Sequence, residues 1–179
     1  IEPVRIAAAL GRFAGVDRRF QVRGAAAGVK VIDDYGHHPT EIAAVLSTAR
    51  RQPHTRLVAV FQAHRYTRTA RFLEAFARVL ATADVVVLTD IFAAGETPIP
   101  GVSAERLADA VRGQTDRPVH LVQTLDEGVS QVADMARSGD LVLTPGAGSI
   151  GDVGDRLLEA IARKTGGGGH PEEKRPETR

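Results

Sequence analysis

The amino-acid sequence predicts an α/β fold: a Rossmann-like, doubly wound domain with a mostly parallel sheet of about six strands, one antiparallel strand, and helices on both faces. After residue 28, short apolar segments alternate regularly with longer segments of helical periodicity. The apolar segments are continuous, which is typical of strands covered on both faces. Strands and helices that alternate in this way form a parallel sheet through right-handed crossovers.

The predicted elements follow in order along the chain. Residues 2–13 have a helical pattern that places five apolar side chains on one face: Val4, Ile6, Ala7, Leu10 and Phe13. Residues 20–23 and 29–32 flank a turn region, 24–28, and predict a hairpin whose first strand is the antiparallel one. The remaining strands are expected at residues 57–61, 85–89, 119–122 and 141–143. The remaining helices are expected at residues 40–51, 68–81, 104–112, 125–137 and 153–163.

Several predicted boundaries have a chemical reason. The sequence Pro39-Thr40-Glu41 suits a helix start, where proline fits the first turn and an acid complements the helix dipole. Ser103 is expected to be an N-cap, and Gly139 to follow the end of the preceding helix. A glycine run and a charged remainder close the sequence. We therefore expect a domain at residues 1–163 and a disordered tail at residues 164–179.

Composition limits the class of protein. A net charge of +1 argues against a nucleic-acid-binding face, and the absence of cysteine excludes a disulfide framework. The chain has no long apolar run and no signal-peptide pattern, so we expect no membrane span and a cytoplasmic location. Because the chain begins with Ile1, we expect a fragment or a processed chain.

Two polar runs, at residues 33–41 and 62–69, each follow a predicted strand and lead into a predicted helix. The carboxyl ends of parallel strands form the crevice where such folds bind ligands. Asp34 could hold two ribose hydroxyls, or it could form an Asx turn or a helix cap. Tyr35 and His37 offer flat faces for a base, or they could pack between layers.

The second run brings His64, Arg65 and Arg68 to the same predicted edge. If a helix begins there, Arg65 and Arg68 lie on one face, where two guanidinium groups suit a carboxylate or a phosphate. Positive charges oppose the dipole at a helix N-terminus, which favours an anionic ligand over a solvated helix start.

Other motifs carry less weight. Residues 146–151 match the G-x-G-x-x-G dinucleotide fingerprint, but this is the last strand–helix unit, so no later strand carries the acid that would hold a ribose. NAD binding therefore remains one explanation of these glycines, and tight packing between the strand and the helix is the other. The spacing of His37, His38, His54 and His64 fits no common metal motif, so we expect no metal site in this chain. The sequence contains no P-loop and no G-x-S-x-G elbow.

The two polar runs closely resemble the C-terminal domain of the Mur ligases, and His-Arg-Tyr-Thr-Arg at 64–68 resembles the alanine-adding members of the family. Residues 15–20, 94–101 and 146–148 follow the family pattern in the same order. Ala63 stands where the family usually has proline, and Ser149 where it usually has Asp or Asn. Ser149 leaves the role of its loop open.

The resemblance implies one domain of a three-domain cytoplasmic enzyme that joins L-alanine to UDP-N-acetylmuramate through an acyl phosphate, with ATP and Mg²⁺ as cofactors. The metal and the P-loop belong to a central domain absent from this chain, so the domain alone is expected to be inactive and to hold no catalytic residue. The partners are ATP, both substrates and the other two domains, with no nucleic acid and no membrane.

The resemblance also assigns roles to individual residues. It places Arg18, Arg19, Asp34, Tyr35 and His37 at the nucleotide. It places Tyr35, His37, His64, Arg65 and Arg68 at L-alanine and the sugar-nucleotide carboxylate. Clamping the carboxylate of an amino acid aims its amine, which is catalysis by positioning. The alternatives are a murein tripeptide ligase domain, an NAD-binding domain and a non-catalytic module that binds another protein.

Overall fold

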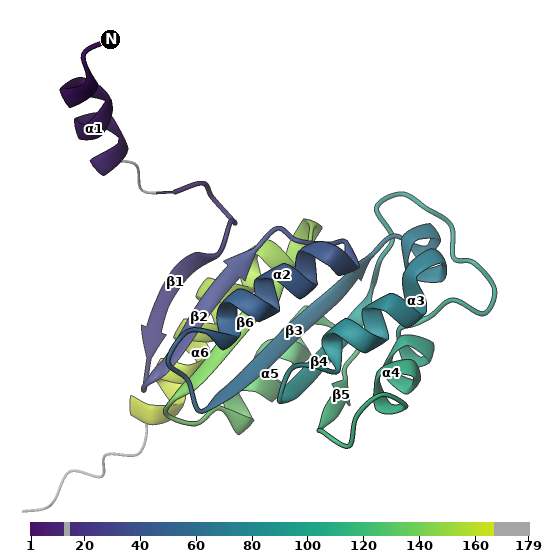
Figure 1. The fold of residues 1–179 in the computed structure, drawn as a ribbon. Helices are drawn as coiled ribbons and strands as arrows, with labels where there is room; N and C mark the ends of the chain where they lie inside the picture. Colours follow the sequence, from purple (N-terminus) through teal and green to yellow (C-terminus); the bar gives the residue numbers. More distant parts are fainter. Residues whose placement is uncertain (13–14, 167–179) are drawn as a thin grey trace, which may run out of the picture.

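The computed structural model describes residues 1–12 and 15–166, and a mixed sheet forms the centre of this part of the chain (Figure 1). Its six strands lie in the order β1-β2-β6-β3-β4-β5. β1 pairs antiparallel with β2, and the other neighbours pair in parallel, so the predicted fold class is confirmed. The strands are β1 (Gln21–Ala26), β2 (Val29–Asp34), β3 (Arg56–His64), β4 (Val85–Phe92), β5 (Val119–Leu121) and β6 (Asp140–Pro145).

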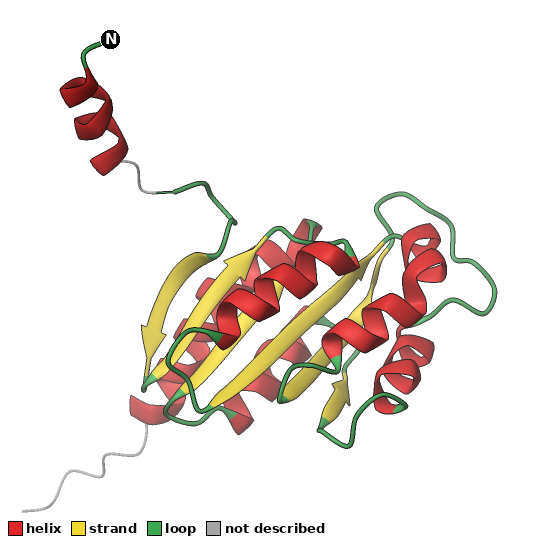
Figure 2. Cartoon of the chain, in the orientation of Figure 1, coloured by secondary structure: helices red, strands yellow, loops and turns green. Residues whose placement is uncertain are grey.

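Helices cover both faces of the sheet (Figures 1 and 2). The helices are α1 (Pro3–Gly11), α2 (Pro39–Arg50), α3 (Tyr66–Leu80), α4 (Ala104–Arg112), α5 (Leu125–Met135) and α6 (Val153–Gly166), with a short 3₁₀ turn, η1 (Gly148–Asp152). One apolar core lies between the sheet and α2, α3 and α4, and a second lies between the sheet and α5 and α6. In β3, Leu57, Ala59 and Phe61 join the first core, whereas Val58 and Val60 join the second. This division explains why the strand is apolar at every position from Leu57 to Phe61.

The chemistry of the helix starts agrees with most of the predicted boundaries. The Ser103 side chain accepts a hydrogen bond from the Arg106 amide at the start of α4. Glu41 accepts hydrogen bonds from the His38 and His37 amides at the start of α2, where His38 is the N-cap. Gly139 has a positive φ of 91°, but it lies in the turn before β6, because α5 already ends at Met135.

The strands reach further than the sequence pattern predicted. β3 continues to His64 and β4 to Phe92, so Gln62, Ala63 and His64 belong to the sheet rather than to a loop. Gln62 pairs with Thr89 and His64 pairs with Phe92 of β4, with a shift of register at Ala63. Pairing of the backbone groups decides the conformation regardless of side-chain polarity. Consequently the second polar run is held rigidly for its first three residues.

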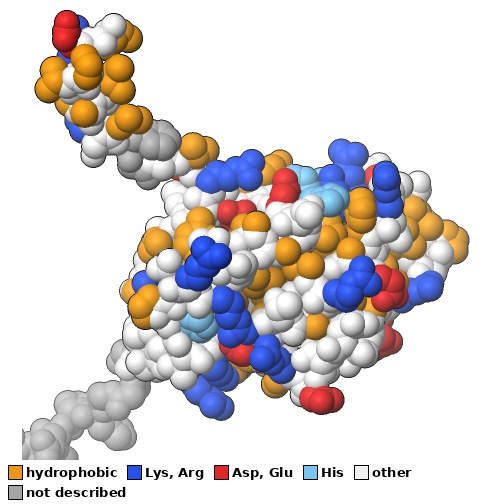
Figure 3. Space-filling view, in the orientation of Figure 1, with side chains coloured by type: hydrophobic (Ala, Val, Ile, Leu, Met, Phe, Trp, Pro, Cys, Tyr) orange, Lys and Arg blue, Asp and Glu red, His pale blue; other side chains and the backbone are white. Residues whose placement is uncertain are grey.

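The two ends of the described chain differ from expectation. α1 stands apart from the sheet and has no buried residue, so the apolar side chains of Val4, Ile6 and Leu10 are exposed (Figures 1 and 3). Phe13, predicted for the same face, lies outside the described residues. α6 continues to Gly166, three residues into the segment expected to be a disordered tail, and residues 167–179 lie outside the described part. No helix in the described ranges combines the length and the apolar character that crossing a bilayer requires.

Candidate functional site

The predicted site residues gather at the carboxyl edge of the sheet, where β2, β6, β3 and β4 end (Figure 1). β6 lies between β2 and β3, although it is the last strand in the sequence. The crossover through α2 therefore passes over β6, and the chain returns from β5 to the middle of the sheet. An open α/β sheet binds its ligands at such a change of strand order.

Asp34 is buried, and both of its carboxylate oxygens are bonded within the chain. Oδ1 accepts a hydrogen bond from the Gly36 amide at 2.7 Å, and Oδ2 accepts one from the Phe20 amide at 2.7 Å. The bond to Gly36 is the Asx turn that the sequence offered as an alternative to ribose binding. Asp34 thus holds the loop after β2 against the start of β1.

Arg18 fixes the other side of this loop. Its Nε donates to Oδ2 of the buried Asp33 at 2.8 Å, and its Nη2 donates to the Gly146 carbonyl oxygen at 2.6 Å. Thr144 donates to the second oxygen of Asp33 at 3.1 Å. Asp33 was not among the predicted site residues, although its position at the end of a buried strand was the available signal. The Arg18 guanidinium is thus bonded to other groups of the protein. Arg19 is exposed, so it is the more accessible of the two arginines to a ligand.

Tyr35 is the centre of the residues predicted to meet a nucleotide, and its side chain is exposed. The guanidinium carbons of Arg18 and Arg19 lie 5.2 Å and 5.9 Å from its ring centroid. The His37 ring lies 5.2 Å from it in an edge-on arrangement, and His37 Nδ1 lies 3.0 Å from the Tyr35 carbonyl oxygen. The structure therefore brings together an aromatic face, a cation and an imidazole, as the sequence predicted.

His64 connects the two polar runs. Its ring lies 6.0 Å from the His37 ring and 5.4 Å from the Phe92 ring, and its Nδ1 lies 3.4 Å from Arg68 Nη1. Burial lowers the pKa of His64 below its usual value of 6.5, and the positive charge of Arg68 lowers it further. The imidazole is consequently neutral at neutral pH. Because Arg68 can only donate to Nδ1, the ring proton lies on Nε2, which can donate a hydrogen bond to a ligand.

Arg65 precedes α3, which begins at Tyr66 rather than at the predicted Arg68. Its backbone has φ 77° and ψ 137°, a conformation that costs a non-glycine residue about 1–3 kcal/mol. The Arg65 amide donates to the Phe92 carbonyl oxygen at 2.8 Å, which ties this residue to the end of β4. Backbone strain of this kind concentrates at ligand-binding sites.

A shallow groove of about 530 Å³ lies beside these arginines. Its lining consists of three arginines with a histidine, a threonine and an aromatic ring: His38, Arg65, Thr67, Arg68, Arg71 and Phe72. Arg71 was not among the predicted site residues, and its i, i+3 spacing from Arg68 was the signal for it. No acid lines this groove, so its chemistry suits an anionic group.

The glycine-rich loop after β6 is packed by the chain's own side chains. A Cβ on Gly148, whose φ is 82°, would lie 3.0 Å from the Phe92 ring. A Cβ on Gly151 would lie 2.8 Å from the Arg18 guanidinium carbon. Ser149 donates to Gln62 Oε1 at 3.0 Å. Tight packing therefore explains why glycines occupy these positions. Such packing is the alternative to NAD binding that was considered from the sequence.

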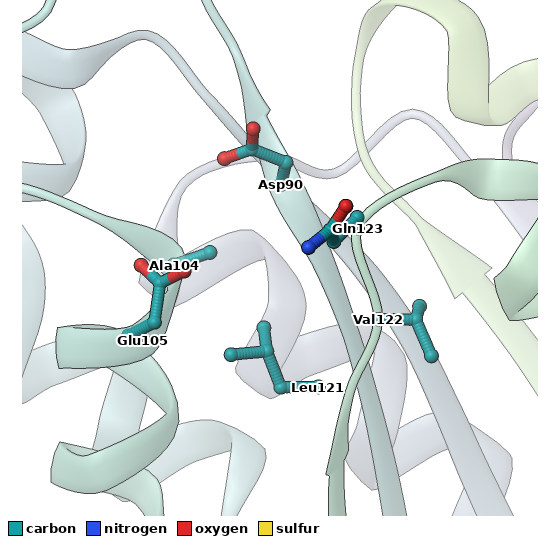
Figure 4. A pocket seen from close by; sticks show the side chains of 6 residues that line it. All are labelled: Asp90, Ala104, Glu105, Leu121, Val122 and Gln123. Carbon is teal, nitrogen blue, oxygen red and sulfur yellow. The ribbon is translucent and has the colours of Figure 1, made fainter.

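A second hollow, of about 310 Å³, lies further along the same edge, between the ends of β4 and β5 and the start of α4 (Figure 4). Asp90, Glu105 and Gln123 surround a floor of Ala104, Leu121 and Val122. The predicted site residues do not line it. Among the described residues, no group of three or more His, Cys, Asp or Glu side chains is arranged to hold a metal ion.

The fold and the candidate site define a Rossmann-like α/β domain whose carboxyl edge carries histidine, tyrosine and arginine groups. The comparison with known families specifies this class further. Residues 18–148 match the family described as "Mur ligase, glutamate ligase domain", and the chain belongs to this family.

Curated relatives are consistent with this assignment. The UDP-N-acetylmuramate–L-alanine ligase of Solibacter usitatus is 50% identical over 161 residues, which are 90% of this chain and 34% of that protein. The ligase of the same name from an Anaeromyxobacter species (strain Fw109-5) is 53% identical over 150 residues, 84% of this chain and 32% of that protein. This chain therefore spans about a third of the length of these relatives.

A solved structure agrees with the sequence relatives. The UDP-N-acetylmuramate–alanine ligase MurC of Thermotoga maritima superposes with a TM-score of 0.72 at 26% identity. The superposition covers 93% of this chain and 34% of that one. The family that the two polar runs indicated is therefore confirmed, and so is the resemblance to its alanine-adding members.

Proposed function

We propose that this chain is the C-terminal domain of a cytoplasmic, ATP-dependent ligase that joins L-alanine to UDP-N-acetylmuramate in peptidoglycan precursor synthesis. The curated relatives at about 50% identity carry the name of that ligase, which supports the proposal. The observation that carries it is the meeting of the two polar runs, with the His37 and His64 rings 6.0 Å apart. One run offers a nucleotide-binding surface, and the other offers an anion-binding one.

In this proposal, ATP phosphorylates the lactyl carboxylate of UDP-N-acetylmuramate, and the amine of L-alanine attacks the acyl phosphate and displaces phosphate. The P-loop and Mg²⁺ belong to a central domain outside this chain. The domain formed by the present chain binds and orients the substrates and supplies no catalytic group. Orientation alone can account for a large part of a rate enhancement, because it turns a bimolecular step into an effectively unimolecular one.

The nucleotide side of the site is built around Tyr35. We propose that the adenosine of ATP lies against the Tyr35 face, with Arg19 and His37 at its rim. Arg18 supports this surface from behind through Asp33, and Asp34 shapes the loop. A carboxylate has about four lone-pair sites, and Asp34 uses two of them internally. The remaining two can accept ribose hydroxyls.

The amino-acid side of the site is built around His64, Arg65 and Arg68. We propose that Arg65 and Arg68 hold the carboxylates of L-alanine and the sugar nucleotide. The neutral imidazole of His64 carries its proton on Nε2, because Arg68 donates to Nδ1, and this N–H can donate a hydrogen bond to a ligand carboxylate. His64 and His37 then lie between the amine and the nucleotide.

The experiment is steady-state kinetics on the full-length enzyme with Arg68→Ala. We expect the KM for L-alanine to rise at least tenfold, because a charge-assisted hydrogen bond contributes about 1.5–3 kcal/mol, while the KM for ATP changes much less. Arg78→Ala is the matched control, since Arg78 lies on the same helix but lines a different groove. Equal losses for L-alanine and ATP would contradict the role assignment. A preference for a tripeptide over L-alanine in the wild type would point to a murein tripeptide ligase instead.

A further inference from the structure

The N-terminus of α3 lacks a cap of its own. Arg65 is its N-cap residue, but the Arg65 side chain makes no capping hydrogen bond, and the first turn contains no acid. A helix start without a cap leaves backbone N–H groups unpaired, and the positive end of the dipole lies next to Arg65 and Arg68. This helix start is therefore electrostatically unfavourable by itself.

Glu96, in the loop after β4, supplies the missing cap from another part of the chain. Its Oε2 accepts a hydrogen bond from the Thr67 amide at 3.0 Å, and its Oε1 accepts one from the Thr67 hydroxyl at 2.6 Å. These two bonds lower the pKa of Glu96 below its usual range, and the positive charge of Arg65 adds to the effect. Glu96 is therefore an anion at the point where the helix needs one.

The loop that carries Glu96 is shaped to reach this position. Ala94 and Gly95 have positive φ angles of 49° and 85°, and the Glu96 amide donates to the Ala93 carbonyl oxygen at 3.0 Å. The Arg65 amide is bonded to the Phe92 carbonyl oxygen at the start of the same loop. Residues 92–96 thus hold the start of α3 at two points, on either side of Tyr66.

Arg65 itself shows the consequence of this clamp. Its φ of 77° is unfavourable for a side chain with a Cβ, and such a conformation persists only where the surroundings enforce it. One enforcing contact is the bond from the Arg65 amide to the Phe92 carbonyl oxygen. The other is the pair of bonds from Glu96 to Thr67, which lies two residues beyond Arg65 in α3. Without Glu96, the first turn of α3 is free to fray and Arg65 is free to relax.

We propose that Glu96 is a positioning residue for the amino-acid site: it acts through Thr67 and fixes the first turn of α3, so that Arg65 and Arg68 are aimed at a ligand carboxylate. The inference rests on the proposed function for the identity of the ligand, but the clamp itself does not depend on it. It predicts that a residue with no contact to the substrate controls the affinity for the amino acid.

The test compares Glu96→Ala and Glu96→Gln in the full-length enzyme. Glu96→Ala should raise the KM for L-alanine about tenfold, because a small misplacement of a binding group has large effects, with the KM for ATP nearly unchanged. Glu96→Gln keeps an acceptor oxygen for Thr67 and should restore part of the loss. Glu105→Ala is the matched control, since Glu105 is an acid in the first turn of the neighbouring helix α4 and lies away from the site.

A second measurement keeps the two proposals distinguishable. In the 179-residue chain alone, Glu96→Ala should speed hydrogen exchange of the Thr67 amide about tenfold, while Glu105→Ala leaves it unchanged. If the wild-type enzyme shows no L-alanine-dependent ATP hydrolysis, the proposed function fails, and the exchange rate of Thr67 still decides whether the clamp exists. An unchanged KM for L-alanine in an active, folded Glu96→Ala enzyme would overturn the positioning role. An equal rise in the KM for ATP would do the same.

Discussion

Asp33 and Asp34 are adjacent and both buried, yet they serve different parts of the site. Asp33 faces Arg18 and Thr144, and Asp34 faces two backbone amides. The sequence showed that acids end a buried strand, but side chains at successive positions of a strand point to opposite faces. Which acid meets the arginine depends on β1 and β6, which lie far away in the sequence. The presence of acids at the end of this strand was therefore predictable from the sequence, but the partner of each acid was not.

His64 is the residue whose ionisation the structure constrains most clearly among the predicted site residues. Its pKa is lowered from 6.5 by burial first and then by Arg68, so the folded protein binds this proton less readily than the unfolded chain does. The contribution of neutral His64 to the free energy of unfolding is therefore complete above pH 6.5. It is lost as the pH falls from 6.5 toward the lower pKa of the folded state. Arg68→Ala should shift the pKa upward, toward 6.5.

An NMR titration of the His64 ring signals in the wild type and in Arg68→Ala measures both values directly. Arg78→Ala serves as the control, because it removes the same charge from the same helix outside the groove. A wild-type pKa at or above 6.5 would contradict the burial argument, and a value that Arg68→Ala leaves unchanged would contradict the contribution of the Arg68 charge.

Among the elements, α3 shows most clearly where sequence reasoning stops. Its helical pattern was visible, but its start was placed at Arg68 instead of Tyr66. Local start signals are an N-cap side chain or an acid in the first turn, and α3 has neither. The cap comes from Glu96, 29 residues away in the sequence. A start that is stabilised from a distant loop leaves no local trace.

Gly148, in the glycine-rich loop after β6, can be compared directly with Gly95, in the loop after β4. Gly148 and Gly95 have nearly equal φ angles, 82° and 85°, so an alanine at either site meets a similar backbone cost, about 1–2 kcal/mol. A Cβ at Gly148 would also press on the Phe92 ring at 3.0 Å, whereas nothing lies within 4 Å of a Cβ at Gly95. Gly148→Ala should therefore lower the free energy of unfolding by roughly 1–3 kcal/mol more than Gly95→Ala does, which is the usual cost of overpacking.

Urea unfolding of the two variants and the wild type measures this difference. Equal destabilisation would mean that backbone conformation alone requires these glycines, and that the contact with Phe92 carries no energy. A larger effect at Gly148 would show that the loop is packed tightly against the end of β4, next to Arg65 and His64.

For the whole molecule, the sequence predicted the fold class but not the strand order. Alternating strands and helices specify a parallel sheet, whereas the insertion of β6 between β2 and β3 depends on a return across the sheet that no local pattern records. That insertion places the loop after β6 between the two polar runs. The sequence indicated both runs, but only the strand order explains why Gly146 bonds to both Arg18 and Asp34.

The affinity for ATP depends on how much of the nucleotide site the whole chain contains. In the proposed function, this chain contacts the adenosine of ATP through Tyr35, Arg19, His37 and Asp34, and the phosphates meet a P-loop that the 179 residues do not contain. Adenosine contacts without phosphate contacts supply little affinity, so we expect a Kd of about 1 mM or weaker for ATP, which corresponds to about −4 kcal/mol. Adenosine itself should bind about as well as ATP, and Tyr35→Ala should remove the binding of both. Isothermal titration calorimetry on the 179-residue chain measures all three quantities. Micromolar ATP binding, or a large advantage of ATP over adenosine, would show that this chain holds the phosphates itself, and the division of the site between two domains would then be wrong.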